Sequence, residues 1–113
     1  MSQDAIFSQL NNDPMVRELL PVFDNALDQR LKELRSHIDV GDLGAIAGKA
    51  HSIKGSAGFY GYEALALLAQ RLEGEALEHR TLVELDKTLA ELGAMAARIR
   101  AGISVGISKS RAH

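Results

Sequence analysis

Residues 14–38 read PMVRELLPVFDNALDQRLKELRSHI, and their hydrophobic positions follow the period of an α-helix. The hydrophobic side chains recur in steps of three and four, which places them in one stripe: Val16, Leu19, Leu20, Phe23, Leu27, Leu31, Leu34 and Ile38. Asp13 and Pro14 are typical of an N-cap and a first helical position, and Gly41 marks the end. Pro21 removes one internal hydrogen bond and predicts a kink or a break. Because the stripe keeps its phase across this residue, a kink is favoured.

Three further amphipathic segments follow the first. They span residues 42–61, 62–76 and 81–103. Asp42 is the expected N-cap of the second helix, and Thr81 forms a capping box with Glu84 at the start of the fourth. Four amphipathic helices joined by short connections can bury their stripes together only as an up-and-down bundle. The sequence therefore predicts an all-α, antiparallel up-and-down four-helix bundle over residues 14–103.

The two ends of the chain carry weaker patterns. Three hydrophobic residues fall on one side of a short extra N-terminal helix over residues 4–10, which would cap the bundle or offer apolar surface to a partner. The tail over residues 104–113 has weak periodicity, and we expect it to be mobile. A length of 113 residues fits one domain over residues 1–113, and the starting Met1 and short tail favour a complete chain.

Composition and charge exclude several classes of function. Hydrophobic residues make up 46% of the chain and charged residues 25%, so neither disorder nor a fibrous repeat is expected. The absence of cysteine excludes disulfides, thiolate metal sites and cysteine nucleophiles. A net charge of −2 argues against nucleic-acid binding, and no apolar run is long enough to span a membrane. We therefore expect a cytoplasmic monomer whose partners are proteins.

The second predicted helix contains residues that a helical bundle does not need. Three glycines interrupt it: Gly48, Gly55 and Gly58. Each helix-interior glycine costs about 1 kcal/mol relative to alanine, so the three require a reason. At about 100° per residue, the glycines and Lys54 lie within about 60° of His51, away from the hydrophobic stripe. His51 is therefore expected on a bare, solvent-facing flank that another macromolecule can approach closely.

An acidic residue is predicted to lie beside His51. If the second and third helices form an antiparallel hairpin, positions at equal height have numbers that sum to about 124, so His51 faces Glu73. A carboxylate that accepts a hydrogen bond from one ring nitrogen fixes the tautomer and leaves the other nitrogen nucleophilic. Lys54, one turn from His51, would offset the charge of an arriving phosphoryl group. The three side chains together predict a nucleophilic histidine.

The segment from His51 to Gly58, HSIKGSAG, is followed by Gly61 and by a leucine-rich stretch that ends in Leu72–Glu73. This pattern resembles the signature of histidine-containing phosphotransfer (HPt) domains of bacterial multistep phosphorelays. The resemblance implies a four-helix bundle that accepts a phosphoryl group on its histidine from the aspartyl phosphate of one receiver domain and passes it to another. Phe59–Tyr60 departs from the family pattern, in which a small or aliphatic pair is usual.

The resemblance also implies roles for individual residues. His51 matches the phosphorylated residue, Lys54 the lysine beside the phosphate, and Glu73 the Gln-or-Glu position that holds the ring. The small residues expected to let a receiver domain dock are Ala47, Gly48, Gly55 and Gly58. The expected partners are receiver domains of hybrid sensor kinases and of response regulators.

The sequence also indicates what the partner must supply. Gly48–Lys49 is followed by alanine, so the chain has no ATP-binding motif, and we expect a phosphocarrier rather than a kinase. No cluster of acidic residues surrounds His51 in the predicted helices. We therefore expect no metal site and no bound cofactor on this chain, and a Mg²⁺ ion on the partner receiver domain.

Two alternatives to phosphotransfer stay open. One is a helical-bundle interaction module that binds a signalling partner without exchanging phosphate. The other is an enzyme acting on a small molecule, for which the predicted bundle offers no evident cavity. Residues 102–106 match G-x-S-x-G but lack the strand-to-helix turn of a nucleophile elbow. The spacing of Glu33 with His37, repeated further along the chain, is one residue too long for a di-metal bundle.

Overall fold

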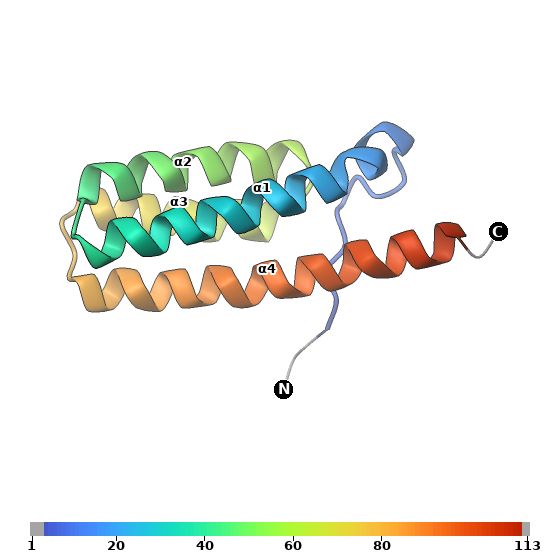
Figure 1. The fold of residues 1–113 in the computed structure, drawn as a ribbon. Coiled ribbons are helices and arrows are strands. Elements are labelled where there is room, and N and C mark those ends of the chain that lie inside the picture. Colours follow the sequence, from blue (N-terminus) through green and yellow to red (C-terminus); the bar gives the residue numbers. More distant parts are fainter. Residues whose placement is uncertain (1–3, 112–113) are drawn as a thin grey trace.

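Four helices form the described part of the chain, residues 4–111 of the computed structural model. They are α1 (Pro14–Asp39), α2 (Leu43–Phe59), α3 (Glu63–Leu77) and α4 (Leu82–Arg111). Consecutive helices run in opposite directions, and α1 packs against both α2 and α4, which closes the bundle (Figure 1). The prediction of an all-α four-helix bundle is confirmed, and residues 4–111 contain no strand.

Side-chain caps fix where the helices begin. The Asp13 carboxylate accepts a hydrogen bond from the amide two residues on, and Asp42 accepts one from the amide three residues on. The capping box at the start of α4 is present, because the amide of Thr81 donates to Glu84 Oε2 and the amide of Glu84 donates to Thr81 Oγ1, each at 3.2 Å. At the end of α2, Gly61 has a φ of +82° and permits the tight turn into α3.

The hydrophobic stripes of the four helices meet in one core. Its largest fully buried side chains are Leu27 and Leu34 of α1, Ile46 and Ile53 of α2, Leu65 and Leu72 of α3, and Leu85, Leu92 and Ile99 of α4. Burial of each such side chain contributes roughly 1.5–3 kcal/mol, so the core dominates the stability of the fold. The core also fixes the rotation of each helix about its axis, and this decides which residues face solvent.

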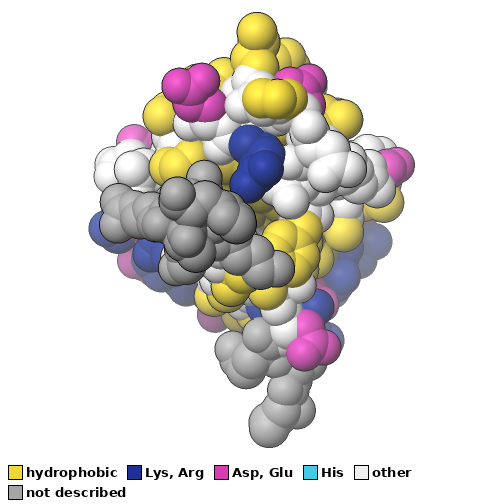
Figure 2. All heavy atoms as spheres, turned by 90° about the vertical axis from the view of Figure 1, so that its right-hand side faces the viewer, with side chains coloured by type: hydrophobic (Ala, Val, Ile, Leu, Met, Phe, Trp, Pro, Cys, Tyr) yellow, Lys and Arg dark blue, Asp and Glu magenta, His cyan; other side chains and the backbone are white. Residues whose placement is uncertain are grey.

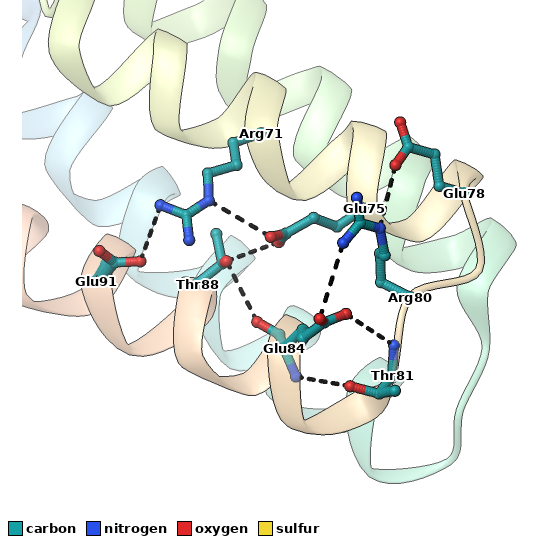
Figure 3. A network of polar contacts seen from close by, with 8 residues as sticks. All are labelled: Arg71, Glu75, Glu78, Arg80, Thr81, Glu84, Thr88 and Glu91. Atoms are coloured by element: carbon teal, nitrogen blue, oxygen red, sulfur yellow. Dashed lines mark hydrogen bonds and ion pairs between the residues drawn. The ribbon is translucent and has the colours of Figure 1, made fainter.

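A polar network joins α3 to α4 at the edge of the core (Figure 3). Thr88 of α4 is fully buried, and its hydroxyl donates to Glu75 Oε1 of α3 at 2.6 Å. The other carboxylate oxygen of Glu75 accepts a hydrogen bond from Arg71, which also pairs with Glu91 of α4. The network therefore holds the two helices at one relative height.

The N-terminal segment differs from the prediction. No helix forms over residues 4–10; residues 4–8 have no regular secondary structure, and a turn covers residues 9–12. The amide of Ile6 donates to the carbonyl of Arg98 in α4, and the amide of Gln9 donates to the carbonyl of Gly61. The segment is thus a strap that ties α4 to the turn between α2 and α3, and tertiary hydrogen bonds replace those of a helix.

Two further expectations about the helices need correction. α1 is continuous through Pro21, so the alternative of a break is wrong. α4 continues to Arg111, eight residues beyond its expected end at Ile103, so the chain described up to residue 111 forms no irregular tail. Gly102 belongs to the packing of this helix, because a Cβ there would collide with the carbonyl oxygen of Ile6. Residues 112–113 of the expected mobile tail lie outside the described residues.

Candidate functional site

His51 stands on the solvent-facing side of α2. Its side chain is 67% exposed, while Ala50 and Ile53 on the opposite side of the helix are buried in the core. The local sequence explains this orientation, because the core stripe of α2 is built from alanine and isoleucine and leaves His51 on the outer face. An imidazole in this position is open to a macromolecular partner.

The glycines around His51 are not required by packing within the chain. A Cβ built on Gly48, Gly55 or Gly58 would meet no atom within 4 Å, and all three residues are exposed. Alanine would fit at each position and would favour the helix by about 1 kcal/mol. The space that these glycines leave open therefore lies outside the fold, where another molecule would approach His51.

Ala47 does not belong to this bare surface. Its exposed fraction is only 8%, and it packs in the core with Ala50 and the other buried residues of α2. The prediction that Ala47 is a docking residue is wrong, because its side chain faces the core of the bundle and is not accessible to a partner. Gly48, Gly55 and Gly58 remain as the exposed small positions.

Glu73 of α3 lies beside the imidazole, at the height predicted from the helix hairpin. Its Oε2 atom is 3.0 Å from Nδ1 of His51, and its Oε1 atom is 3.2 Å from Nζ of Lys54. The Glu73 side chain is 19% exposed and the Lys54 side chain 33%. One carboxylate is therefore shared between the histidine and the lysine of α2.

The charge of the site follows from these contacts. Burial would raise the pKa of Glu73, but the hydrogen bond and charge of Lys54, followed by those of His51, outweigh burial and hold this pKa below its usual value. Glu73 is therefore a carboxylate at neutral pH. Since a carboxylate only accepts hydrogen bonds, we assign the ring proton of neutral His51 to Nδ1. The free lone pair then lies on Nε2, which is the nucleophilic nitrogen.

The position of Lys54 was only partly predictable. Its spacing placed it one turn from His51, and the structure agrees. Its ion pair with Glu73 was missed, although Lys54 lies on the side of α2 that faces α3. The lysine is thus anchored at the edge of the site, with its ammonium group within the same carboxylate bridge as the imidazole.

The other described histidines lie away from this site. His37 and His79 make no contact with this site; His37 lies in the last turn of α1, and His79 follows α3 with a φ of +57°. His113 lies outside the described residues. Among the residues that the structure describes, no group of three or more His, Asp or Glu side chains is arranged to hold a metal ion. No helix within residues 4–111 is both long and apolar enough to cross a membrane.

The fold and the site define a class: a four-helix bundle that presents one carboxylate-supported histidine on an open flank. A family model described as the Hpt domain matches residues 18–102. The chain therefore belongs to the Hpt domain family, whose members carry out histidine phosphotransfer in phosphorelays and interact with receiver domains. Searches of curated proteins and of solved structures found no significant match.

Proposed function

We propose that this chain is a phosphorelay intermediate that is phosphorylated on His51. It accepts the phosphoryl group from the aspartyl phosphate of one receiver domain and passes it to the aspartate of another. The observation that carries the proposal is the shared carboxylate of Glu73, 3.0 Å from Nδ1 of an otherwise exposed imidazole. This arrangement makes Nε2 a nucleophile that a partner protein can reach.

The transfer step balances in protons and charge. Nε2 of neutral His51 attacks the phosphorus of the aspartyl phosphate, the bond from phosphorus to the acyl oxygen breaks, and the receiver carboxylate leaves. The proton on Nδ1 stays in place, so the phosphorylated ring carries a positive charge beside the Glu73 carboxylate. Attack by the next receiver aspartate reverses these changes. Glu73 therefore orients the ring and stabilises the charge that develops on it.

Besides its ion pair with Glu73, Lys54 stabilises the phosphorylated state of His51. Its ammonium group is anchored 3.2 Å from Glu73 Oε1, one helical turn from His51. A phosphoryl group on Nε2 brings negative charge to this surface, and a nearby ammonium lowers the energy of that state. The chain supplies the nucleophile and these two charged side chains, and the receiver supplies the Mg²⁺ ion that holds the phosphoryl oxygens. In this proposal the chain is a cytoplasmic monomer without a resident cofactor.

A labelling experiment tests the assignment of His51. The wild-type chain is mixed with a receiver domain carrying radioactive phosphate, and the chain should gain label that is labile in acid and stable in alkali. The His51→Gln variant should gain none. His37→Gln is the matched control and should label like the wild-type chain, because His37 lies at the end of α1.

Label that persists in the His51→Gln variant would overturn the assignment. Tight binding of a receiver to both the wild-type chain and His51→Ala, with no label on either, would favour the alternative of an interaction module without phosphoryl exchange.

A further inference from the structure

Four hydrophobic side chains lie exposed on one side of His51. Met15, Leu19 and Val22 belong to α1 and Phe59 ends α2, and we call these four residues the Phe59 patch. The exposed fractions of the side chains range from 38% for Leu19 to 72% for Met15. Hydrophobic side chains are visible at several points on the end of the bundle where α1 begins (Figure 2). These four residues are not part of the buried core, because the buried stripe of α1 runs through Leu20, Phe23 and Leu27.

The α1 members of the patch face the α2 side of α1. Glu33 of α1 forms an ion pair with Lys49 of α2 at 2.7 Å, which identifies the face of α1 that adjoins α2. At about 100° per residue, Met15, Leu19 and Val22 lie within about 40° of the direction of Glu33. The three residues therefore form a stripe on the α2 side of α1. Val22 lies at the height of the end of α2, and Leu19 and Met15 lie beyond that end.

Phe59 continues this stripe on the face of α2 that carries His51. The ring centroids of Phe59 and Tyr60 are 5.0 Å apart in an edge-to-face arrangement, and those of Tyr60 and Phe23 of α1 are 5.1 Å apart. This contact sets Val22, the neighbour of Phe23, at nearly the height of Phe59. On α2, Phe59 is turned about 80° from His51, toward the side opposite Glu73. The ring is thus held by the aromatic contacts beneath it, yet it remains 69% exposed.

The distances fit the footprint of a single protein partner. Phe59 lies eight residues, or about 12 Å, along α2 from His51. The rise along α2 and the usual distance between the axes of two packed helices together place the backbone of Val22 about 16 Å from that of His51. A typical stable interface buries about 800 Å² on each partner, which corresponds to a disc of about 16 Å radius. A partner positioned over His51 therefore reaches Phe59 and, if it extends toward the beginning of α1, Val22.

Along α2, the surface between His51 and Phe59 carries little charge. Residues 52–59 contain one charged residue, Lys54, and its ammonium group is bound by Glu73 on the opposite side. In the other direction along α2 lie Lys49, with its partner Glu33, and Asp42. Charged residues are depleted, and aromatic residues enriched, in the buried centre of protein interfaces. This asymmetry favours docking toward Phe59 over docking toward the turn between α1 and α2.

From these observations we infer that the phosphoryl donor or acceptor docks over the Phe59 patch, with a hydrophobic surface of its own beside its aspartyl phosphate. The inference rests on the proposed function and adds the direction of docking and the chemistry of the partner. Phe59 and Val22 are specificity-determining residues in this arrangement, because a receiver with a charged surface at this point would leave that charge unpaired. The departure of Phe59 from the family pattern then reflects the choice of partner.

Substitutions on and off the patch test the inference. The probe is a phosphorylated receiver domain that labels the wild-type chain, and the quantity measured is its KM in the transfer reaction. Phe59→Ala and Val22→Glu should each raise KM about tenfold or more, as loss of an interface anchor does. Met15→Glu should have a smaller effect, because Met15 is farther from His51. Val83→Glu is the matched control at the far end of the bundle, and its KM should equal that of the wild-type chain.

A small-molecule donor separates the two levels of the proposal. Phosphoramidate needs no docking surface, so it should label His51 equally in the wild-type chain and in all four variants. If Phe59→Ala and Val22→Glu have the same KM as Val83→Glu, the inference is overturned while the proposed function stands. A wild-type dimer that Val22→Glu dissociates would also overturn it, because a second copy would then be the occupant. A wild-type chain that takes no label from either donor would overturn the proposed function itself.

Discussion

Two carboxylates of α3, Glu73 and Glu75, are almost equally exposed, at 19% and 17%, and each is shared between two hydrogen-bond donors. Glu73 binds His51 and Lys54 of α2, whereas Glu75 binds Arg71 of its own helix and Thr88 of α4 (Figure 3). The difference lies in the donors. Thr88 is fully buried, so one branch of the second network ends inside the bundle, and the other branch runs through Arg71 to Glu91 at the surface.

The donor that Glu73 supports is open to solvent, since the His51 side chain is 67% exposed. The burial of a carboxylate therefore does not distinguish a structural network from a functional one. What distinguishes them is whether the supported group retains an unused lone pair at the surface. Nε2 of His51 carries such a lone pair, whereas the hydroxyl of Thr88 is buried and the guanidinium of Arg71 has only N–H donors. The following substitutions test this contrast.

Removal of the Glu73 carboxylate should have the largest effect. We expect Glu73→Ala to slow phosphotransfer about tenfold to a hundredfold, because a charge-assisted hydrogen bond contributes roughly 1.5–3 kcal/mol. Glu73→Gln retains an acceptor for Nδ1 but not the charge, so its loss should be smaller. The measurement is the single-turnover transfer rate from a phosphorylated receiver. Glu75→Gln is the matched control on the same helix, and equal rates for all these variants would remove Glu73 from the mechanism.

Loss of the Thr88 hydroxyl should affect stability instead. Thr88→Val keeps the shape of the side chain but removes the donor to Glu75, and we expect the free energy of unfolding to fall by about 1–3 kcal/mol. The transfer rate of the folded variant should not change. Urea unfolding and the same single-turnover assay measure the two quantities. Thr88→Ser restores the hydroxyl and should recover the hydrogen bond; a transfer rate that falls with Thr88→Val would mean that the two networks are coupled.

The sequence was sufficient to predict the paired helices and the position of Glu73, and the reason is geometric. Leu65, Leu72 and the other core residues recur at helical spacing, and Asp42 and Thr81 mark helix starts through local hydrogen bonds. Once the turn between two helices is located, the heights of facing residues follow from the rise per residue. His51 and Glu73 could therefore be paired before any coordinates were known.

The features that were missed depend on contacts between segments distant in the sequence. The strap over residues 4–10 is not helical, because the amides of Ile6 and Gln9 pair with the carbonyls of Arg98 and Gly61, partners that no local pattern reveals. Ala47 is covered because one side of α2 is closed at its height, and alanine itself carries no signal of burial. Leu19 of the Phe59 patch has the spacing of the hydrophobic stripe of α1. It was therefore assigned to the core, although it is exposed.

The glycines offer a smaller test in which stability and function change in opposite directions. Because a Cβ on Gly55 would meet no atom within 4 Å, Gly55→Ala should raise the free energy of unfolding by about 0.5–1 kcal/mol. The added methyl group should nevertheless raise the KM for a receiver domain. Gly93→Ala in α4, where a Cβ is equally unobstructed, is the matched control. It should give the same stabilisation with an unchanged KM, and the same result for both variants would show that Gly55 serves no docking partner.

The smallest expected effect is the dependence of stability on pH. Lys54 and His51 hold the pKa of Glu73 below its ordinary value of 4.5, so the folded chain keeps this carboxylate ionised at pH values where the unfolded chain protonates it. The resulting stabilisation is fully present above the unfolded pKa and is lost as the pH falls through the lower folded pKa. The difference in unfolding free energy between the wild-type chain and Glu73→Gln should therefore shrink as the pH is lowered from about 6 to about 3 at constant ionic strength.

Lys54→Gln provides the control for this measurement, because it removes the main group that lowers the pKa of Glu73. In the Lys54→Gln background, burial opposes ionisation and only His51 favours it, so the pH dependence attributable to Glu73→Gln should weaken. A dependence of equal size in both backgrounds would show that the ion pair between Glu73 and Lys54 does not persist in solution. Lys54 would then be free to approach a phosphoryl group on His51 without first leaving the carboxylate that supports the ring.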